Sequence, residues 1–394
     1  MLNYASKICL APMVRSGELP IRLVSLKYGC DLVWTPEIVD KKLITCVRTV
    51  NPSLGTIDYI ESKNQSLTFR KHPLEDGKLV LQLGSSNADL AVEAGLKVIN
   101  DVDGIDLNCG CPKHFSIHSG MGAALLRTPD VLCEILTALV EKVGRPNNKP
   151  ISCKIRLLPE FEETKTLVER ICATGISNLT IHCRTPIMRN RQDPIWNYLP
   201  KLIPIIQDSG VNVIINGNMQ GVKDLASLQT AMKNDQVGIM IAEAAEANPS
   251  VFSEAPRLQK QIVKDVFEAC KKYHSFSGSK FLIQNMVHGK SKYYQELCRT
   301  KTFADMEVLI ERIIDDTEDA KMNRITNRNS QKFNSYTLEE YNEHMNKRGV
   351  LMHQFFDNWR EEEMLKRLND DPKKEVKRVK VNSVDVNKRV KIAS

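Results

Sequence analysis

The sequence predicts an α/β fold: a (β/α)8 TIM barrel followed by a smaller all-helical domain and a basic, disordered C-terminal tail. Eight short apolar runs recur between Ile8 and Ala242, separated by polar or Gly/Pro-containing breaks and by segments with helical periodicity. Such repeated strand–helix units favour a closed parallel barrel. A doubly wound open sheet is the alternative, which is disfavoured because no G-x-G-x-x-G motif follows the first run.

The strands and helices of the barrel are expected from these apolar patterns. The expected strands are Ile8–Ala11, Leu32–Thr35, Leu79–Leu83, Ile105–Leu107, Ile151–Ile155, Leu179–His182, Val211–Ile215 and Ile239–Ala242. The expected helices are Glu18–Tyr28, Asn87–Ile99, Asp130–Val143, Glu162–Thr174, Val222–Met232 and, with a weaker pattern in which Pro194 is an early helical residue, Asp193–Gln207. The second strand–helix unit is irregular. Its segment Lys41–His72 is expected to leave the barrel as a long insertion with short strands.

The strand pattern stops after about Pro256, which divides the chain into residues 1–255, 256–368 and 369–394. Amphipathic helices are expected at Leu258–Tyr273, Lys280–Tyr294 and Thr302–Ile314. Asp315–Thr337 is polar and is expected to be a linker. Leu338–Arg367 has the pattern of one more helix, with a break at Gly349, and the last segment has the composition of a disordered tail.

Composition and charge limit the classes of function. The chain has 394 residues, lacks an apolar run long enough for a membrane span, and shows no secretory signal at its start. Its eleven cysteines are expected to stay reduced, in the cytoplasm or also the nucleus. From Lys366 onward ten Lys/Arg stand against four Asp/Glu, so most of the net charge of +7 lies at this end. Either a polyanion partner or a merely solvated end would explain this excess of positive charge.

A Gly- and Cys-rich loop, from Asn108 to Gly122, follows the fourth expected strand. Loops after barrel strands carry the chemistry of such folds. Cys111 lies between Gly110 and Pro112, which argues against an ordinary core cysteine. A zinc site is the rival interpretation, with Cys109, Cys111, His114 and His118 as ligands. Their spacing is tighter than that of common structural zinc sites.

Several other expected strands also end in polar residues. Lys154 and Arg156 lie two positions apart, as do His182 and Arg184, so each pair shares one face of its strand. A buried ammonium needs an anionic partner, either a bound anion or a carboxylate such as Asp106. Barrels often bind phosphate after strands seven and eight, where Asn216, Gly217, Asn218, Ala242 and Glu243 lie. Together with Gln82, this set favours flavin mononucleotide (FMN).

The motifs that carry these residues resemble the tRNA-dihydrouridine synthases, and in particular the eukaryotic branch that modifies uridine 20 of the D-loop. They are APMV at 11–14, TPEIVD at 35–40, DLNCGCPK at 106–113, GMGAALL at 120–126, CKIR at 153–156, His-Cys-Arg at 182–184 and NGN at 216–218. The resemblance implies a TIM barrel with a C-terminal helical domain that binds tRNA. It also implies that NADPH or NADH reduces FMN, from which a hydride passes to uracil C6.

The resemblance also implies roles for individual residues, and we expect the protein to act as a monomer without a bound metal. Cys111 is the acid that protonates uracil C5. Position 243 is Glu where many relatives have Arg. The expected cofactor-binding residues are Pro12, Met13, Val14, Gln82, Lys154, His182, Asn216, Gly217, Asn218, Ala242 and Glu243. The expected substrate-binding residues are Glu37, Asn108, Lys113, Arg156 and Arg184.

Two other functions remain open at this stage. A flavin dehydrogenase for a free pyrimidine would use a similar barrel but would need neither a helical domain nor a basic tail. A catalytically silent RNA-binding barrel would lack bound flavin.

Overall fold

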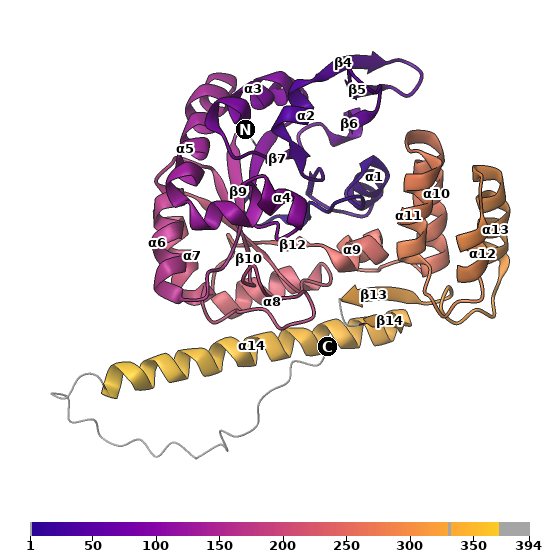
Figure 1. Cartoon of the computed structure of the whole chain (residues 1–394). Coiled ribbons are helices and arrows are strands. Elements are labelled where there is room, and N and C mark those ends of the chain that lie inside the picture. Colours follow the sequence, from indigo (N-terminus) through magenta and orange to yellow (C-terminus); the bar gives the residue numbers. More distant parts are fainter. Residues whose placement is uncertain (1, 330–331, 370–394) are drawn as a thin grey trace, which may run out of the picture.

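Eight parallel strands form a closed barrel in the computed structural model, which describes residues 2–329 and 332–369 (Figure 1). The strands are β1 (Ile8–Leu10), β2 (Leu32–Trp34), β7 (Leu79–Gly84), β8 (Gly104–Cys109), β9 (Ile151–Arg156), β10 (Asn178–His182), β11 (Asn212–Asn216) and β12 (Gly238–Ile241). Their order is β2-β1-β12-β11-β10-β9-β8-β7, and the pairing of β2 with β7 closes the ring. The predicted barrel is therefore confirmed over the open sheet.

The interior of the barrel changes from apolar to polar along the strands. Trp34, Val80 and Met240 belong to a buried cluster inside the ring, together with Tyr4 from the segment before β1. Because alternate strand residues share a face, Gln82 points inward like Val80, two residues before it. The inward side chains near the carboxyl ends are thus polar, and they form the floor of a site.

The helices that surround the barrel follow the predicted order. They are α1 (Leu19–Lys27), α3 (Ala88–Val98), α5 (Pro129–Leu139), α6 (Phe161–Cys172), α7 (Leu199–Asp208) and α8 (Lys223–Met232), with the short helices α4 (His114–His118) and α9 (Glu243–Ala247). Asn87 caps α3, since its Oδ1 accepts a hydrogen bond from the backbone N–H of Leu90 at 2.9 Å.

The predicted start of one helix, at Asp193, is wrong, because α7 begins only at Leu199. Pro194 lies before the helix, and Pro200 occupies the early helical position instead. The backbone N–H of Ile195 bonds to the carbonyl of Cys183 at 2.7 Å, which ties the preceding segment to the end of β10 as a loop. This loop reaches the mouth of the barrel.

The irregular second unit contains short strands, as predicted. They are β3 (Ile38–Val39), which extends β7, and an antiparallel sheet of β4 (Cys46–Asn51), β5 (Thr56–Glu61) and β6 (Leu67–Lys71), with α2 (Asp40–Ile44) in between. Arg48 forms a two-bond ion pair with Asp101, at 2.7 and 2.8 Å, which attaches this sheet to the barrel.

Four helices follow the barrel and lie together at one side of it (Figure 1). They are α10 (Gln259–Tyr273), α11 (Phe276–Met286), α12 (Tyr294–Arg299) and α13 (Phe303–Asp315). The single helix predicted at Lys280–Tyr294 is wrong. Ser275 caps α11, so this helix starts earlier, and Tyr294 begins a separate helix.

The segment predicted as a linker, Asp315–Thr337, contains a β-hairpin of β13 (Ile325–Asn329) and β14 (Lys332–Tyr336). The predicted helix break at Gly349 is also wrong, since α14 (Leu338–Asn369) is continuous. A Cβ at Gly349 would lie 2.7 Å from Ser227 Oγ, so the glycine allows α14 to approach α8 closely. Figure 1 shows α14 running along α8, away from α10–α13.

Asn369, the first residue of the predicted tail 369–394, ends α14, and the rest of the tail lies outside the described residues, so its predicted disorder stays a prediction. No helix within residues 2–329 and 332–369 combines the length and apolar character needed to cross a bilayer.

Candidate active site

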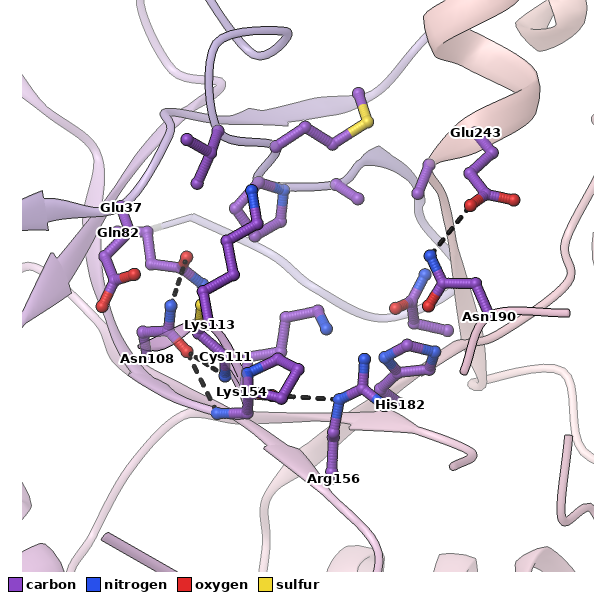
Figure 2. Close-up of a pocket in the computed structure, with 18 of the residues that line it drawn as sticks. Glu37, Gln82, Asn108, Cys111, Lys113, Lys154, Arg156, His182, Asn190 and Glu243 are labelled. Atoms are coloured by element: carbon purple, nitrogen blue, oxygen red, sulfur yellow. Dashed lines mark hydrogen bonds between the residues drawn. The ribbon is translucent and has the colours of Figure 1, made fainter. Parts of the chain in front are cut away.

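Two adjoining cavities open at the carboxyl ends of the barrel strands, and Figure 2 shows residues that line the main one. The main cavity has a volume of ≈ 310 Å³ and the smaller one ≈ 60 Å³. The main cavity is lined by Ala11, Pro12, Met13, Val14, Glu37, Gln82, Asn108, Gly110, Cys111, Pro112, Lys113, Lys154, Arg156, His182, Asn190, Asn216, Ala242, Glu243 and Glu246. The smaller cavity shares five of these residues and extends along the loops after β11 and β12.

Cys109 and Cys111 face different parts of the molecule. Cys109 ends β8 fully buried, with its sulfur 3.5 Å from that of Cys153, in the layer between barrel and helices. Asn108 then turns the chain, because its Oδ1 accepts hydrogen bonds from the N–H groups of Gly110 and Cys111, both at 3.0 Å. Cys111 therefore faces the main cavity, half-buried.

The four residues of the zinc hypothesis do not converge. Cys109 faces the layer outside the barrel, whereas His114 and His118 stack on each other along α4 with ring centroids 5.0 Å apart. In the part of the chain that the structure describes, no three His, Cys, Asp or Glu side chains lie together as a metal site would require.

A chain of hydrogen bonds runs from a buried carboxylate to the Cys111 loop. Asp106 is fully buried, and its Oδ2 accepts from Gln82 Nε2 at 2.9 Å. Gln82 Oε1 in turn accepts from Asn108 Nδ2 at 3.2 Å, which directs Asn108 Oδ1 towards the loop (Figure 2). Since an ionised carboxylate only accepts, Asp106 sets the orientation of both amides. Burial raises the pKa of Asp106 to about 6.

The Cys111 loop is held from two further sides. Arg156 Nε donates to the carbonyl of Gly110 at 3.0 Å, and Arg156 Nη1 donates to the carbonyl of Thr185 at 3.0 Å. Gly122 has φ +60°, and a Cβ there would lie 2.7 Å from the carbonyl oxygen of Cys111. Only glycine accommodates both this backbone angle and this contact. The position of Cys111 is therefore fixed by its surroundings.

Glu37 places a carboxyl beside Cys111. Its Oε1 accepts from Ser116 Oγ at 3.1 Å, whereas Oε2 is buried and has no hydrogen-bond partner among the described residues. Burial raises the pKa of Glu37. Burial and the nearby Glu37 carboxylate both raise the pKa of the Cys111 thiol, so it stays protonated at neutral pH. The cavity thus contains a neutral thiol acid and an acceptor oxygen that a ligand can use.

Lys154 and Arg156 form the cationic side of the main cavity, and His182 lies beside them (Figure 2). Burial and the neighbouring Arg156 lower the pKa of Lys154 to about 8. Arg184 Nη1 lies 3.1 Å from His182 Nε2, and because arginine has only donors, Nε2 must be the acceptor. His182 is therefore neutral with its hydrogen on Nδ1, consistent with the lowering of its pKa by burial and nearby cations.

The smaller cavity has the features of an anion site. Gly217 and Asn218 both have positive φ, +121° and +63°, so consecutive N–H groups of this turn can point to one side. A Cβ at Gly217 would lie 3.3 Å from His182 Cδ2, so the glycine keeps the turn open. Arg184 lines this cavity, and Glu243 accepts a hydrogen bond from Asn190 Nδ2 at 2.8 Å.

The predicted site residues gather in these two cavities. Gly217, Asn218 and Arg184 line the smaller cavity, and all the others line the main one. Three further residues were not predicted from the sequence: Asn190 and Glu246 in the main cavity and Arg328 in the smaller one. No sequence signal identified them, because Asn190 lies between an expected strand and an expected helix, Glu246 lies after the last expected strand, and Arg328 lies in the segment expected to be a linker.

The chain matches the family model "Dihydrouridine synthase (Dus)" over residues 9–345. It belongs to the dihydrouridine synthase family. The Saccharomyces cerevisiae tRNA-dihydrouridine(20) synthase [NAD(P)+] is 47% identical over 330 residues, 80% of this chain and 86% of the relative. The Schizosaccharomyces pombe protein of the same name is 44% identical, over 79% of this chain and 66% of the relative. A human tRNA-dihydrouridine(20a/20b) synthase [NAD(P)+]-like protein is 30% identical, over 63% of this chain and 70% of the relative.

The match to the dihydrouridine synthase family extends beyond the barrel. It includes the hairpin and the start of α14. The missed residue Arg328 lies within that matched range.

Proposed function

We propose that this protein reduces uridine 20 in the D-loop of tRNA to 5,6-dihydrouridine, using FMN that is reduced by NADPH or NADH. The observation that carries the proposal is the position of Cys111, a neutral thiol held at the wall of a cavity that also contains the cation of Lys154. Higher identity to the two tRNA-dihydrouridine(20) synthases than to the human 20a/20b relative supports position 20.

The residues present fit an FMN group. The open turn at Gly217, where a Cβ would contact His182, and the adjoining Arg184 suit a phosphate at the smaller cavity. Lys154 can hold the anionic edge of the ring system, and Gln82 offers an amide whose orientation Asp106 fixes. Bound there, reduced FMN would supply a hydride to uracil C6.

The chain's own part in the reaction is to bind the base and deliver a proton. The uracil must leave its stack to enter a cavity at the end of a barrel. Glu37 Oε2 can accept a hydrogen bond from a uracil N–H, and Asn108 and Lys113 line the same wall. Cys111 Sγ then gives its proton to C5, leaving a thiolate that solvent reprotonates. Arg156 keeps the loop in place through Gly110.

Recognition of the rest of the tRNA falls to surfaces outside the barrel mouth. We assign it to the helical region after residue 256 and to the basic tail, as the charge distribution favours. The proposal includes a monomer in the cytoplasm or nucleus, where its eleven cysteines, all unpaired in the described residues, stay reduced.

The test is to incubate the full-length protein with NADPH and tRNA that lacks modifications, then digest the tRNA and quantify dihydrouridine by mass spectrometry. Mapping of the modified position should give dihydrouridine at position 20 only. A tRNA in which uridine 20 is replaced by cytidine is the matched control and should remain unmodified. Modification at 20a or 20b would contradict the assigned position, and a colourless protein without dihydrouridine formation would contradict the activity.

A further inference from the structure

We propose that Arg328, on the hairpin that follows the helical region, binds the phosphate group of FMN and so makes this hairpin part of the cofactor site. The inference rests on the proposed function for the identity of the ligand. Arg328 and Asn329 line the smaller cavity together with Asn216, Gly217 and Asn218, although more than a hundred residues separate the two segments. A cation from outside the barrel therefore faces the turn whose geometry suits an anion.

The hairpin is fixed against this turn by buried contacts. Asn327 is fully buried, and its Nδ2 donates to the backbone carbonyl of Gln220 at 3.3 Å. The strand β13 packs on α9, which follows β12 directly. Neighbouring Arg328 is consequently held at the cavity by a strand with little freedom to move, and not by a loose surface loop.

The helix α14 also holds the same turn in place. Arg348 Nη2 donates to the carbonyl of Asn218 at 2.8 Å and pairs with Asp224 at 3.2 Å, with both side chains almost fully buried. His344 Nε2 lies 3.0 Å from Gln220 Oε1. The turn after β11 is thus enclosed by β13 and α14, so the C-terminal part of the chain shapes the smaller cavity.

Arg328 is held in a position from which it can bind an anion. Its Nη1 lies 3.4 Å from Glu246 Oε2, its guanidinium carbon lies 5.1 Å from the centroid of the Phe333 ring, and 31% of its side chain is exposed. Glu246 is itself fixed by Ser16 and by Asn285, whose Nδ2 is 3.2 Å away. An arginine has five N–H donors in a planar fork, so it can contact Glu246 with one edge and a phosphate with another.

The charges around the smaller cavity also favour a role for Arg328. Glu243 lines both cavities, and Glu246, which pairs with Arg328, lines the main one; both carboxylates oppose the binding of a phosphate dianion nearby. Arg184 is the barrel's own cation here, but it already contacts His182 and donates to the carbonyl of Gln192 at 2.7 Å. Arg328 offsets the negative charge of Glu246, with which it pairs, and so leaves the smaller cavity able to accept an anion.

The experiment compares two ligands that differ only in the phosphate. Flavin is removed from the full-length protein, and the affinities for FMN and for riboflavin are measured by fluorescence quenching at fixed salt. Arg328→Gln should lower the affinity for FMN about 10-fold and leave that for riboflavin unchanged. The expected loss is at the low end for a charged contact because Arg328 is partly exposed. Arg328→Lys, which keeps the charge, should lose less.

Arg324→Gln is the matched control, since Arg324 precedes the same hairpin but pairs with Glu340 on α14. It should keep the wild-type ratio of FMN to riboflavin affinity. An unchanged ratio in Arg328→Gln would overturn the inference, and weaker tRNA binding in that variant would then assign Arg328 to the RNA. If the wild-type protein binds neither FMN nor riboflavin, both the cofactor proposal and this inference fail. If the wild-type protein binds FMN normally, the result for Arg328→Gln tests this inference alone.

Discussion

Cys109 and Cys111 are two positions apart, and a continued strand would place both on one face of the sheet. Asn108 prevents this, because its side chain caps the N–H groups of Gly110 and Cys111 and ends the strand at Cys109. The Cys109 thiol therefore lies in the layer between barrel and helices, and the Cys111 thiol lies at the main cavity. The different surroundings of the two thiols thus begin with the turn that Asn108 caps.

This difference predicts the outcome of two alanine substitutions. Cys111→Ala should retain bound flavin and its reduction by NADPH, because the thiol is not part of either step. Reduction of tRNA should fall about 10²- to 10⁴-fold, the usual contribution of a positioned acid. Single-turnover assays with prereduced protein measure the loss. Cys109→Ala is the control, and a larger loss in that variant would refute the assignment.

Glu37 should set the pH range in which Cys111 can act as an acid. At the alkaline pH where the thiol titrates, Glu37 is ionised, and its charge raises the pKa of Cys111. Glu37→Gln should therefore lower the pKa of the Cys111 thiol. Cys111 would then lose its proton, and its ability to act as an acid, at a lower pH. The rate of Cys111 alkylation as a function of pH, followed by peptide mass spectrometry, reports this directly. A profile that does not move, or moves to higher pH, would contradict the effect.

Lys154 should make flavin binding dependent on pH. Its pKa of about 8 means that the cation is present below that pH and lost above it, so affinity for FMN should weaken as the pH rises past 8. Lys154→Arg should remove this dependence, since arginine stays charged.

Lys154→Ala should yield protein depleted of flavin, because a charge-assisted contact contributes about 1.5–3 kcal/mol. Full flavin occupancy in Lys154→Ala would exclude Lys154 from the site.

At the scale of elements, the C-terminal segment belongs to the barrel as much as to the helices before it. The hairpin and α14 contact the turn after β11 through Asn327 and Arg348. The group α10–α13 contacts the barrel elsewhere, mainly through α10 on α1. The chain therefore leaves the barrel, forms the helical group, and returns to line the smaller cavity.

The contact between α14 and α8 gives a test of this arrangement. Gly349→Leu should force the helices apart, because even a Cβ would lie 2.7 Å from Ser227 Oγ. The expected destabilisation is about 1–3 kcal/mol, measured by denaturant unfolding. FMN affinity should fall as well, since Arg348 braces Asn218. Val350→Ala is the control on the exposed face of the same helix, and equal effects of the two substitutions would contradict the packing argument.

At the scale of the whole molecule, charge is unevenly distributed along the chain. The residues before Lys366 carry 45 basic and 44 acidic groups, obtained by subtracting ten and four from the totals of 55 and 48. A nearly neutral body attracts a polyanion only weakly, so the tail should supply much of the long-range attraction to tRNA.

Removing residues 369–394 should test this role of the tail. The segment has eight Lys/Arg and four Asp/Glu, and each phosphate it neutralises contributes about 0.9 to the slope of log affinity against log salt on a duplex. The truncated protein should bind tRNA more weakly and with a flatter salt dependence. Its flavin content and NADPH oxidation should not change. Titrations at several salt concentrations that give an unchanged affinity and slope would assign recognition to the helical region and barrel mouth alone.

The sequence by itself determined the barrel, the order of its strands and most of the residues that line the site. These follow from patterns that are local in the chain: apolar runs of strand length, and polar residues where each run ends. All barrel strands end at one rim, so residues such as Gln82, Lys154 and Asn216 had to come together once the topology was known.

Only the tertiary structure decided that Cys109 lies outside the cavity, how Asp106 orients Gln82 and Asn108, and that Arg328 reaches the smaller cavity. It also decided that Gly349 marks a close helix contact and that an apparent linker is a hairpin. Each of these depends on a partner distant in sequence. A glycine that ends a helix and one that admits a neighbouring helix have the same local pattern, and only the packed neighbour distinguishes them.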